Sequence, residues 1–280
     1  MIIGDSANKI NVQGNSITYY REGKGETVIM IHGITTYSFI WRKIAPFFVK
    51  NYDVIIIDLL GCGDSDKPLN EDFSLKRQTS LIKDFCSNVG ITKFHLICHD
   101  VGGGIGQIFA VNFPELLYDL TLINTVAYNF WPVQPIVAMR TPIVRQIAMA
   151  SLDYGMFRLI IKRGLYHKGN INDELMEFFW RPMLTKIGRK GFLHFAKCLD
   201  NKNLTDIEDD LRKLNIPTLI IRGDADVYLS ASISEKLHSE IPNSVLLKIE
   251  TGGHFIQEDE PEWVALSILD FIRKIHEIKP

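Results

Sequence analysis

Cysteine is scarce in this chain: there are four cysteines among 280 residues. Cys62, Cys86, Cys98 and Cys198 are too few and too scattered for a disulfide framework, and no two of them form a C-x-x-C pair. We therefore expect free thiols that serve mainly as packing residues, and neither a zinc ribbon nor a redox motif.

Long apolar segments and an excess of one charge are also missing. No uncharged apolar run approaches the roughly 18 residues of a membrane helix, and the first residues lack the basic and apolar parts of a signal peptide. The 31 Lys and Arg residues nearly balance the 33 Asp and Glu residues, which gives a net charge of −2. We expect a cytoplasmic protein without a membrane partner, and the charge gives no reason to expect a nucleic-acid partner.

The chain has enough apolar residues for an ordinary globular protein, with 46% hydrophobic and 23% charged residues. Short β-branched runs read as buried strands over residues 16–20, 27–31, 54–58 and 94–98. Residues 38–49 and 75–89 read as helices between them, with Ser74 as an N-cap. This alternation predicts an α/β fold, with a mostly parallel sheet that is covered on both faces.

The pattern changes near Tyr128 and near Asn215. After the second change, strands are predicted over residues 218–222 and 244–249, and a last helix begins at Pro261. Residues 129–214 are helical and rich in aromatics, and they interrupt an α/β pattern that resumes afterwards. We therefore expect residues 1–128 and 215–280 to form one α/β core and residues 129–214 to form a helical lid.

The strongest local signal is a strand that runs directly into a glycine cluster, His99-Asp100-Val101-Gly102-Gly103-Gly104, followed by a helix over residues 105–113. In the nucleophile elbow G-x-S-x-G, a tight turn requires small flanking residues and lifts the central side chain above the sheet. Here Cys98 and Gly102 hold the small positions and Asp100 holds the nucleophile position.

At these residues the chain resembles the α/β-hydrolase family, in the branch with an aspartate nucleophile: epoxide hydrolases, haloalkane dehalogenases and haloacetate dehalogenases. His32-Gly33-Ile34-Thr35 is similar to the family's oxyanion-hole turn, and the loop over residues 58–68 is similar to its next strand-end loop. The resemblance implies a triad in the order nucleophile, acid, histidine, which Asp100, Asp226 and His254 provide. It also implies that the backbone N–H groups of Ile34 and Val101 stabilise an oxyanion.

Each assignment has a structural alternative. Asp100 could be a turn or N-cap residue, and Asp224 could replace Asp226 as the acid. Some dehalogenases carry the acid after the preceding strand, where this chain has Asn124 and no carboxylate. His32 and His99 are interpreted as structural residues that bond backbone groups, and His95 has no evident partner. The spacing of His, Cys and carboxylate residues offers no ligand set, so no metal or organic cofactor is expected.

The expected substrate is a small apolar organic molecule, and its leaving group stays open. Haloalkane dehalogenases usually hold the halide with a Trp after the nucleophile and a second donor after His-Gly, but Val101 and Ile34 cannot donate from their side chains. Trp131 or Trp180 could donate instead. For an epoxide, Tyr154 and Tyr166 are the candidate proton donors.

We therefore predict a hydrolase that forms an alkyl ester on Asp100, with an epoxide as the first substrate class. A haloalkane or haloacid and a strained lactone or ester are the alternatives. A small-ligand receptor on a degenerate hydrolase fold is the alternative without catalysis.

Overall fold

A computed structural model describes residues 7–130 and 153–278. Its centre is one eight-stranded sheet with the strand order β1-β2-β4-β3-β5-β6-β7-β8. The strands are β1 Ala7–Val12, β2 Asn15–Gly23, β3 Glu26–Ile31, β4 Tyr52–Ile57, β5 Phe94–Asp100, β6 Leu117–Thr125, β7 Thr218–Gly223 and β8 Ser244–Ile249. Strands β1 and β2 pair antiparallel with each other, β2 pairs antiparallel with β4, and every other pairing is parallel. The prediction of an α/β fold with a mostly parallel sheet is confirmed.

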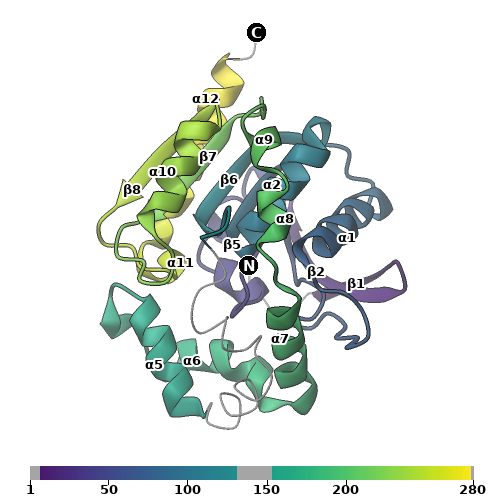
Figure 1. Ribbon diagram of the computed structural model, residues 1–280, viewed down its shortest axis with the longest axis vertical. Helices are drawn as coiled ribbons and strands as arrows, with labels where there is room; N and C mark the ends of the chain where they lie inside the picture. The colour runs from purple at the N-terminus through teal and green to yellow at the C-terminus, as the bar shows by residue number, and fades with distance from the viewer. Residues whose placement is uncertain (1–6, 131–152, 279–280) are drawn as a thin grey trace.

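Helices cover both faces of this sheet (Figure 1). The α-helices in the described residues are α1 Leu75–Asn88, α2 Val101–Asn112, α5 Tyr154–Gly164, α6 Asp173–Trp180, α7 Lys186–Cys198, α8 Lys202–Thr205, α9 Glu208–Leu211, α10 Ala231–Glu240, α11 Ile256–Asp259 and α12 Pro261–Ile278. Short 3₁₀ helices are η1 Ser38–Trp41, η2 Ala45–Phe47, η3 Pro114–Leu116, η4 Lys168–Asn170 and η5 Arg181–Leu184.

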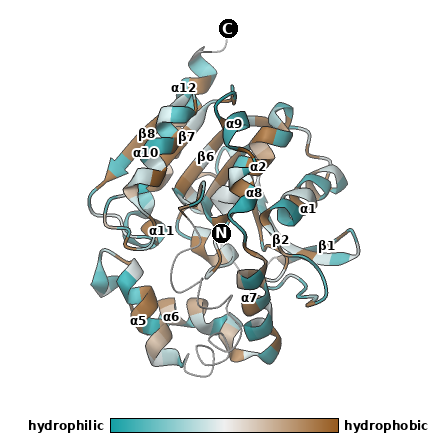
Figure 2. Cartoon of the chain, in the orientation of Figure 1, coloured by the Kyte–Doolittle hydropathy of each residue, from teal (hydrophilic) through white to brown (hydrophobic). Residues whose placement is uncertain are grey.

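The burial of the strands follows from the two covered faces. Every residue of β5 and of β7 is buried, whereas the edge strands β1 and β8 are largely exposed or half-buried. A strand that is covered on both sides can be hydrophobic without alternation, and the central strands are accordingly mostly apolar (Figure 2). The four cysteines are free thiols, as predicted, and three of them are buried.

The helix predicted over residues 38–49 is wrong, because two short 3₁₀ helices, η1 and η2, occupy this segment. Pro46 lies in the first turn of η2. Its ring has no N–H and would clash with the carbonyl of Arg42 in a continuous α-helix. The helix that follows Ser74 begins as predicted, since the Ser74 hydroxyl accepts a hydrogen bond from the N–H of Arg77.

Helices α5, α6 and α7 lie together beyond one end of the sheet, whereas α8 and α9 run back alongside α2 (Figure 1). Parallel strand β5 ends at Asp100, and the group of α5 to α7 lies beyond this carboxyl end. No helix within the described ranges is both long and apolar enough to cross a membrane.

Candidate active site

Asp100 lies at the junction of β5 and α2 in a backbone conformation that side chains rarely adopt, with φ 54° and ψ −123°. The two flanking turns approach so closely that a Cβ atom on Gly102 would lie 2.5 Å from the His32 carbonyl oxygen. Such a strained residue between a strand and a helix is the geometry of a nucleophile elbow. Asp100 occupies the N-cap position of α2, but its side chain forms none of the usual capping hydrogen bonds to this helix.

The turn after β3 holds the Asp100 carboxylate from the other side. The N–H of Ile34 donates to Asp100 Oδ2 at 3.0 Å, and the N–H of Val101 also hydrogen-bonds this carboxylate. A Cβ atom on Gly33 would lie 2.5 Å from Asp100 Oδ2, so only glycine fits there. His32 bonds the Gly33 carbonyl and the Leu59 N–H through its two ring nitrogens, which confirms its structural interpretation.

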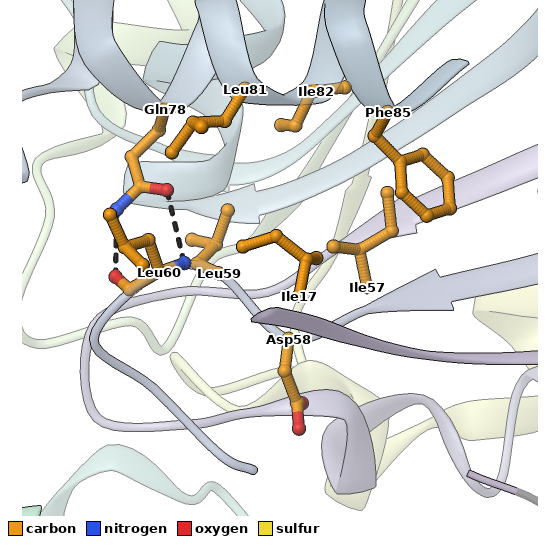
Figure 3. Close-up of a pocket in the computed structure, with 9 residues that line it drawn as sticks. All are labelled: Ile17, Ile57, Asp58, Leu59, Leu60, Gln78, Leu81, Ile82 and Phe85. Atoms are coloured by element: carbon orange, nitrogen blue, oxygen red, sulfur yellow. Dashed lines mark hydrogen bonds between the residues drawn. The ribbon is translucent and has the colours of Figure 1, made fainter. Parts of the chain in front are cut away.

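The loop after β4 is fixed by a buried carboxylate. Asp58 accepts hydrogen bonds from the N–H groups of Ser38 and Asp64, both at 2.8 Å. On the other side of the loop, the Gln78 amide bonds both the N–H and the carbonyl of Leu60 (Figure 3). The cavity beside Gln78 has a volume of about 10 Å³, which is about one water molecule, so it is a packing defect and not a substrate site.

His254 and Asp226 form a buried pair beside the elbow. His254 Nδ1 lies 3.0 Å from Asp226 Oδ2, and Asp226 Oδ1 accepts from the N–H groups of Tyr228 and Leu229. Arg222 lies 3.4 Å from Asp226 Oδ2. The rival acid, Asp224, is exposed, so the structure brings Asp226 and not Asp224 to His254.

The charges of these groups are strongly coupled. Burial on its own would lower the pKa of His254, but the Asp226 carboxylate, which bonds it, and the Asp100 carboxylate together outweigh burial, so that the pKa is raised. Burial on its own would raise the pKa of Asp226, but His254 and Arg222 hold it below its usual range. The pKa of Asp100 is raised by burial, although His254 and the two backbone N–H groups oppose that shift.

Two buried side chains, whose contacts with the histidine loop the sequence analysis did not predict, hold this loop in place. Asn124, at the end of β6, donates to the carbonyls of Gly253 and His254 and accepts from the N–H of Gly223 at 2.9 Å. His99 Nε2 lies 2.9 Å from the His254 carbonyl oxygen, and burial lowers the pKa of His99 to about 3. His99 is therefore neutral and donates from Nε2, which confirms its interpretation as a structural residue that bonds the backbone.

The end of α5 is tied to the same loop. Asp259, which is buried, accepts hydrogen bonds from the N–H groups of Gly253, Tyr166 and His167 at 2.8–2.9 Å. The N–H of Phe255 donates to the Gly164 carbonyl. The helical segment therefore reaches the histidine loop through the backbone.

Aromatic side chains fill the space between η1, α6 and the histidine loop. Phe39 stacks on Phe178 with ring centroids 5.4 Å apart and meets Phe179 edge-on at 4.9 Å. Phe179 in turn meets Phe255, the residue after His254, at 4.9 Å. The side chains that pack between η1, α6 and the histidine loop are therefore apolar.

Three of the four lid residues that were predicted to bind substrate lie within the described residues. Tyr154 and Tyr166 are 38% and 44% exposed. The Tyr154 ring lies against Trp180, and the Tyr166 ring lies against His167. Trp180 also contacts Phe157 and Arg189, and Trp131 lies outside the described residues. Within the described part of the chain, none of these ring contacts joins Tyr154, Tyr166 or Trp180 to Asp100 or His254.

Residues 26–261 match the family described as alpha/beta hydrolase fold. The chain belongs to this family. It is a hydrolase of this fold, and a haloalkane dehalogenase is among the proteins that it resembles.

One similar protein is cis-3-alkyl-4-alkyloxetan-2-one decarboxylase of Shewanella oneidensis, 26% identical over 92% of this chain and 86% of the relative. Another is haloalkane dehalogenase 2 of Mycobacterium bovis, 26% identical over 91% of this chain and 90% of the relative. The crystal structure of haloalkane dehalogenase DbeA from Bradyrhizobium elkani shares the fold with a TM-score of 0.86, at 22% identity over 97% of this chain and 99% of that chain.

Replacing Asn124 tests whether this side chain holds the histidine loop. Asn124→Ala leaves the buried N–H of Gly223 without its acceptor, and we expect the free energy of unfolding to fall by about 1–3 kcal/mol in urea denaturation. Asn124 has a positive φ of 38°, so Asn124→Gly serves as the control that removes the same bonds without backbone strain. If Asn124→Gly is as stable as the unmodified protein, the hydrogen bonds of the Asn124 side chain contribute nothing to the free energy of unfolding.

Proposed function

We propose that this hydrolase works through a covalent alkyl ester on Asp100. The observation that supports this best is the position of the Asp100 carboxylate, which accepts the N–H of Ile34 and of Val101 and lies within electrostatic influence of His254. A carboxylate needs no base to become a nucleophile, and its ester carbonyl would form beside two backbone donors.

In the first step, an Asp100 oxygen attacks a saturated carbon of the substrate, and the bond from that carbon to its leaving group breaks. The leaving group departs with the electron pair. In the second step, His254 takes a proton from water, and the water oxygen adds to the carbonyl carbon of the Asp100 ester. The negative charge then develops on the Asp100 oxygen that faces Ile34 and Val101. When this intermediate collapses, the bond to the alkyl oxygen breaks, that oxygen takes the proton from His254 and leaves as the alcohol, and the Asp100 carboxylate is restored.

We further propose that residues 129–214 act as the lid over this site. The contacts of Phe178 and Phe179 with Phe39 and Phe255 support this role, because they join α6 to η1 and to the residue after His254. The Tyr228 hydroxyl, whose ring meets His254 edge-on, donates to the Ile160 carbonyl of α5. A cover of this kind excludes water and strengthens the electrostatic interactions within the site.

The proposed substrate is a strained, apolar oxygen heterocycle, and an epoxide is the first candidate. Val101 and Ile34 are buried beside Asp100 with apolar side chains, so they offer no hydrogen bond to a departing halide. An epoxide oxygen needs a proton donor, for which Tyr154 and Tyr166 are our candidates. Their rings are partly exposed, and each would turn toward Asp100 to reach the substrate.

A four-membered lactone is the second candidate, and one observation favours it. When Asp100 attacks the saturated ring carbon, the ring oxygen leaves as part of a carboxylate, which needs no proton donor. The relative from Shewanella oneidensis is named for an oxetan-2-one. The resulting ester carries a carboxylate two carbons away, so either water releases a hydroxy acid or carbon dioxide leaves and expels Asp100 to give an alkene.

The ester is tested directly with His254→Gln. Alkylation of Asp100 needs no base and should continue, whereas hydrolysis should slow by about 10²–10⁴-fold because no group activates water. Intact-mass spectrometry after mixing with substrate should show one adduct per chain, mapped to the peptide that contains Asp100. Asp100→Asn in the same background is the control and should give no adduct. An adduct-free His254→Gln protein that still makes product would show that water attacks the substrate directly.

The pH dependence follows from the raised pKa of His254. The histidine must be neutral to act as a base, so the hydrolysis rate should rise with pH through a pKa above 6.5 and then level off. In Asp226→Asn the carboxylate that raises this pKa is gone and burial lowers it, so the midpoint should move to lower pH while the maximal rate falls. Single-turnover rates as a function of pH measure both effects. An unchanged midpoint in Asp226→Asn would show that the Asp226 carboxylate does not raise the pKa of His254.

Turnover of an epoxide, a bromoalkane and a lactone of matched chain length ranks the three candidate substrate classes. We expect diol from at least one apolar epoxide and slower bromide release from the corresponding bromoalkane, because no side chain next to Asp100 supports the halide. The lactone arm is read by gas chromatography for alkene and by liquid chromatography for hydroxy acid. Rapid bromide release without opening of an epoxide or lactone would reverse this order.

A further inference from the structure

A second cluster of ionisable side chains lies at the opposite edge of the sheet from Asp100. It consists of Glu26 at the start of β3, His95 near the start of β5, Asp119 in β6 and His276 in the last turn of α12. His95 and Asp100 are five residues apart on one strand, which separates them by about 16 Å. The end of α12 and the group of α5 to α7 accordingly lie at opposite ends of the molecule (Figure 1).

His95 has a buried carboxylate partner that the sequence analysis did not predict. His95 and Asp119 are paired residues of neighbouring strands and are both fully buried, with His95 Nδ1 2.5 Å from Asp119 Oδ2. Since a carboxylate accepts hydrogen bonds, His95 donates from Nδ1. A carboxylate that holds one ring nitrogen of a histidine in this way orients the other nitrogen, as in many metal sites.

The other ring nitrogen of His95 faces two further ligand atoms. His95 Nε2 is buried and has no hydrogen-bond partner among residues 7–130 and 153–278, and Glu26 Oε2 lies 3.5 Å from it. His276 Nε2 lies 3.1 Å from the same Glu26 oxygen, and the three atoms lie within 4.8 Å of one another. With Nδ1 protonated, neutral His95 presents a lone pair toward a carboxylate. Two acceptors at this distance repel each other unless a cation lies between them.

We propose that Glu26, His95 and His276 bind a zinc ion. Two imidazoles and one carboxylate are ligands that zinc prefers, and metal–ligand bonds near 2.1 Å in a tetrahedron place ligand atoms about 3.4 Å apart. The separations of 3.5 and 3.1 Å match this value. Glu26 and His276 are exposed, so water can reach the fourth position.

The zinc ion would join the C-terminal turn of α12 to the amino ends of β3 and β5. Its role is structural, because it lies far from Asp100. The alternative cation is a proton that makes His95 an imidazolium between Asp119 and Glu26, and this alternative predicts no metal binding.

The test uses the full chain without a polyhistidine tag and with Cys198→Ser, which removes the thiol 3.7 Å from His194 as a competing zinc ligand. Zinc is titrated into metal-free protein by calorimetry, and cobalt(II) is titrated as a probe of tetrahedral geometry by its visible absorption. We expect one ion per chain and a melting temperature that rises with zinc.

His276→Ala and Glu26→Gln should abolish saturable binding and the rise in melting temperature, and both sites are exposed enough for the variants to fold. Asp119→Asn should weaken binding by about 10–100-fold. His238→Ala, an exposed histidine of α10 that bonds Ser244, is the matched control and should bind zinc like the parent protein. The proposal is overturned if the parent protein binds no zinc, or if His276→Ala binds zinc as tightly as His238→Ala.

Discussion

The parallel alignment of the central strands is the constraint on which the candidate active site depends. Ile31 of β3 pairs with Cys98 of β5, Cys98 pairs with Leu122 of β6, and Leu122 pairs with Ile220 of β7. Because the carboxyl ends of parallel strands meet at one edge, residues far apart in the sequence follow them into one region. The turn at Ile34, the elbow at Asp100 and the pair of Asp226 and His254 are brought together in this way.

Within that edge, most of the contacts that organise the histidine loop are made to its backbone. Asn124, His99 and Asp259 bond the main-chain groups of Gly253 and His254, and they come from β6, β5 and α11. The orientation of the His254 ring is then set by its hydrogen bond to Asp226. Position and tautomer of the histidine are therefore controlled by separate groups, which is why several buried polar residues surround the pair of Asp226 and His254.

The sequence was sufficient to predict the fold class, the elbow and the contact between Asp226 and His254. Those features depend on short motifs, because Cys98, Asp100 and Gly102 occupy one tight turn whose requirements are local. Asn124 and His99 were not identified as parts of the site, since their partners are 99–155 residues away in the sequence. His95 was wrongly described as having no evident partner for the same reason, because β6 supplies Asp119 only through strand pairing. The exposure of Tyr154 and Tyr166 depends on how the helices pack, which residue type alone does not determine.

The pair of His95 and Asp119 also limits how this sequence can change over evolutionary time. Both side chains are fully buried, and loss of either one leaves a polar or charged group without compensation, at a cost of about 3–5 kcal/mol. That is a large share of the 5–15 kcal/mol by which domains are typically stable. In related sequences these two positions should therefore be exchanged together, most easily for two apolar residues that fill the same volume. Covariation between neighbouring strands at the amino edge of the sheet would then record a constraint of stability, independent of selection on the reaction at the other edge.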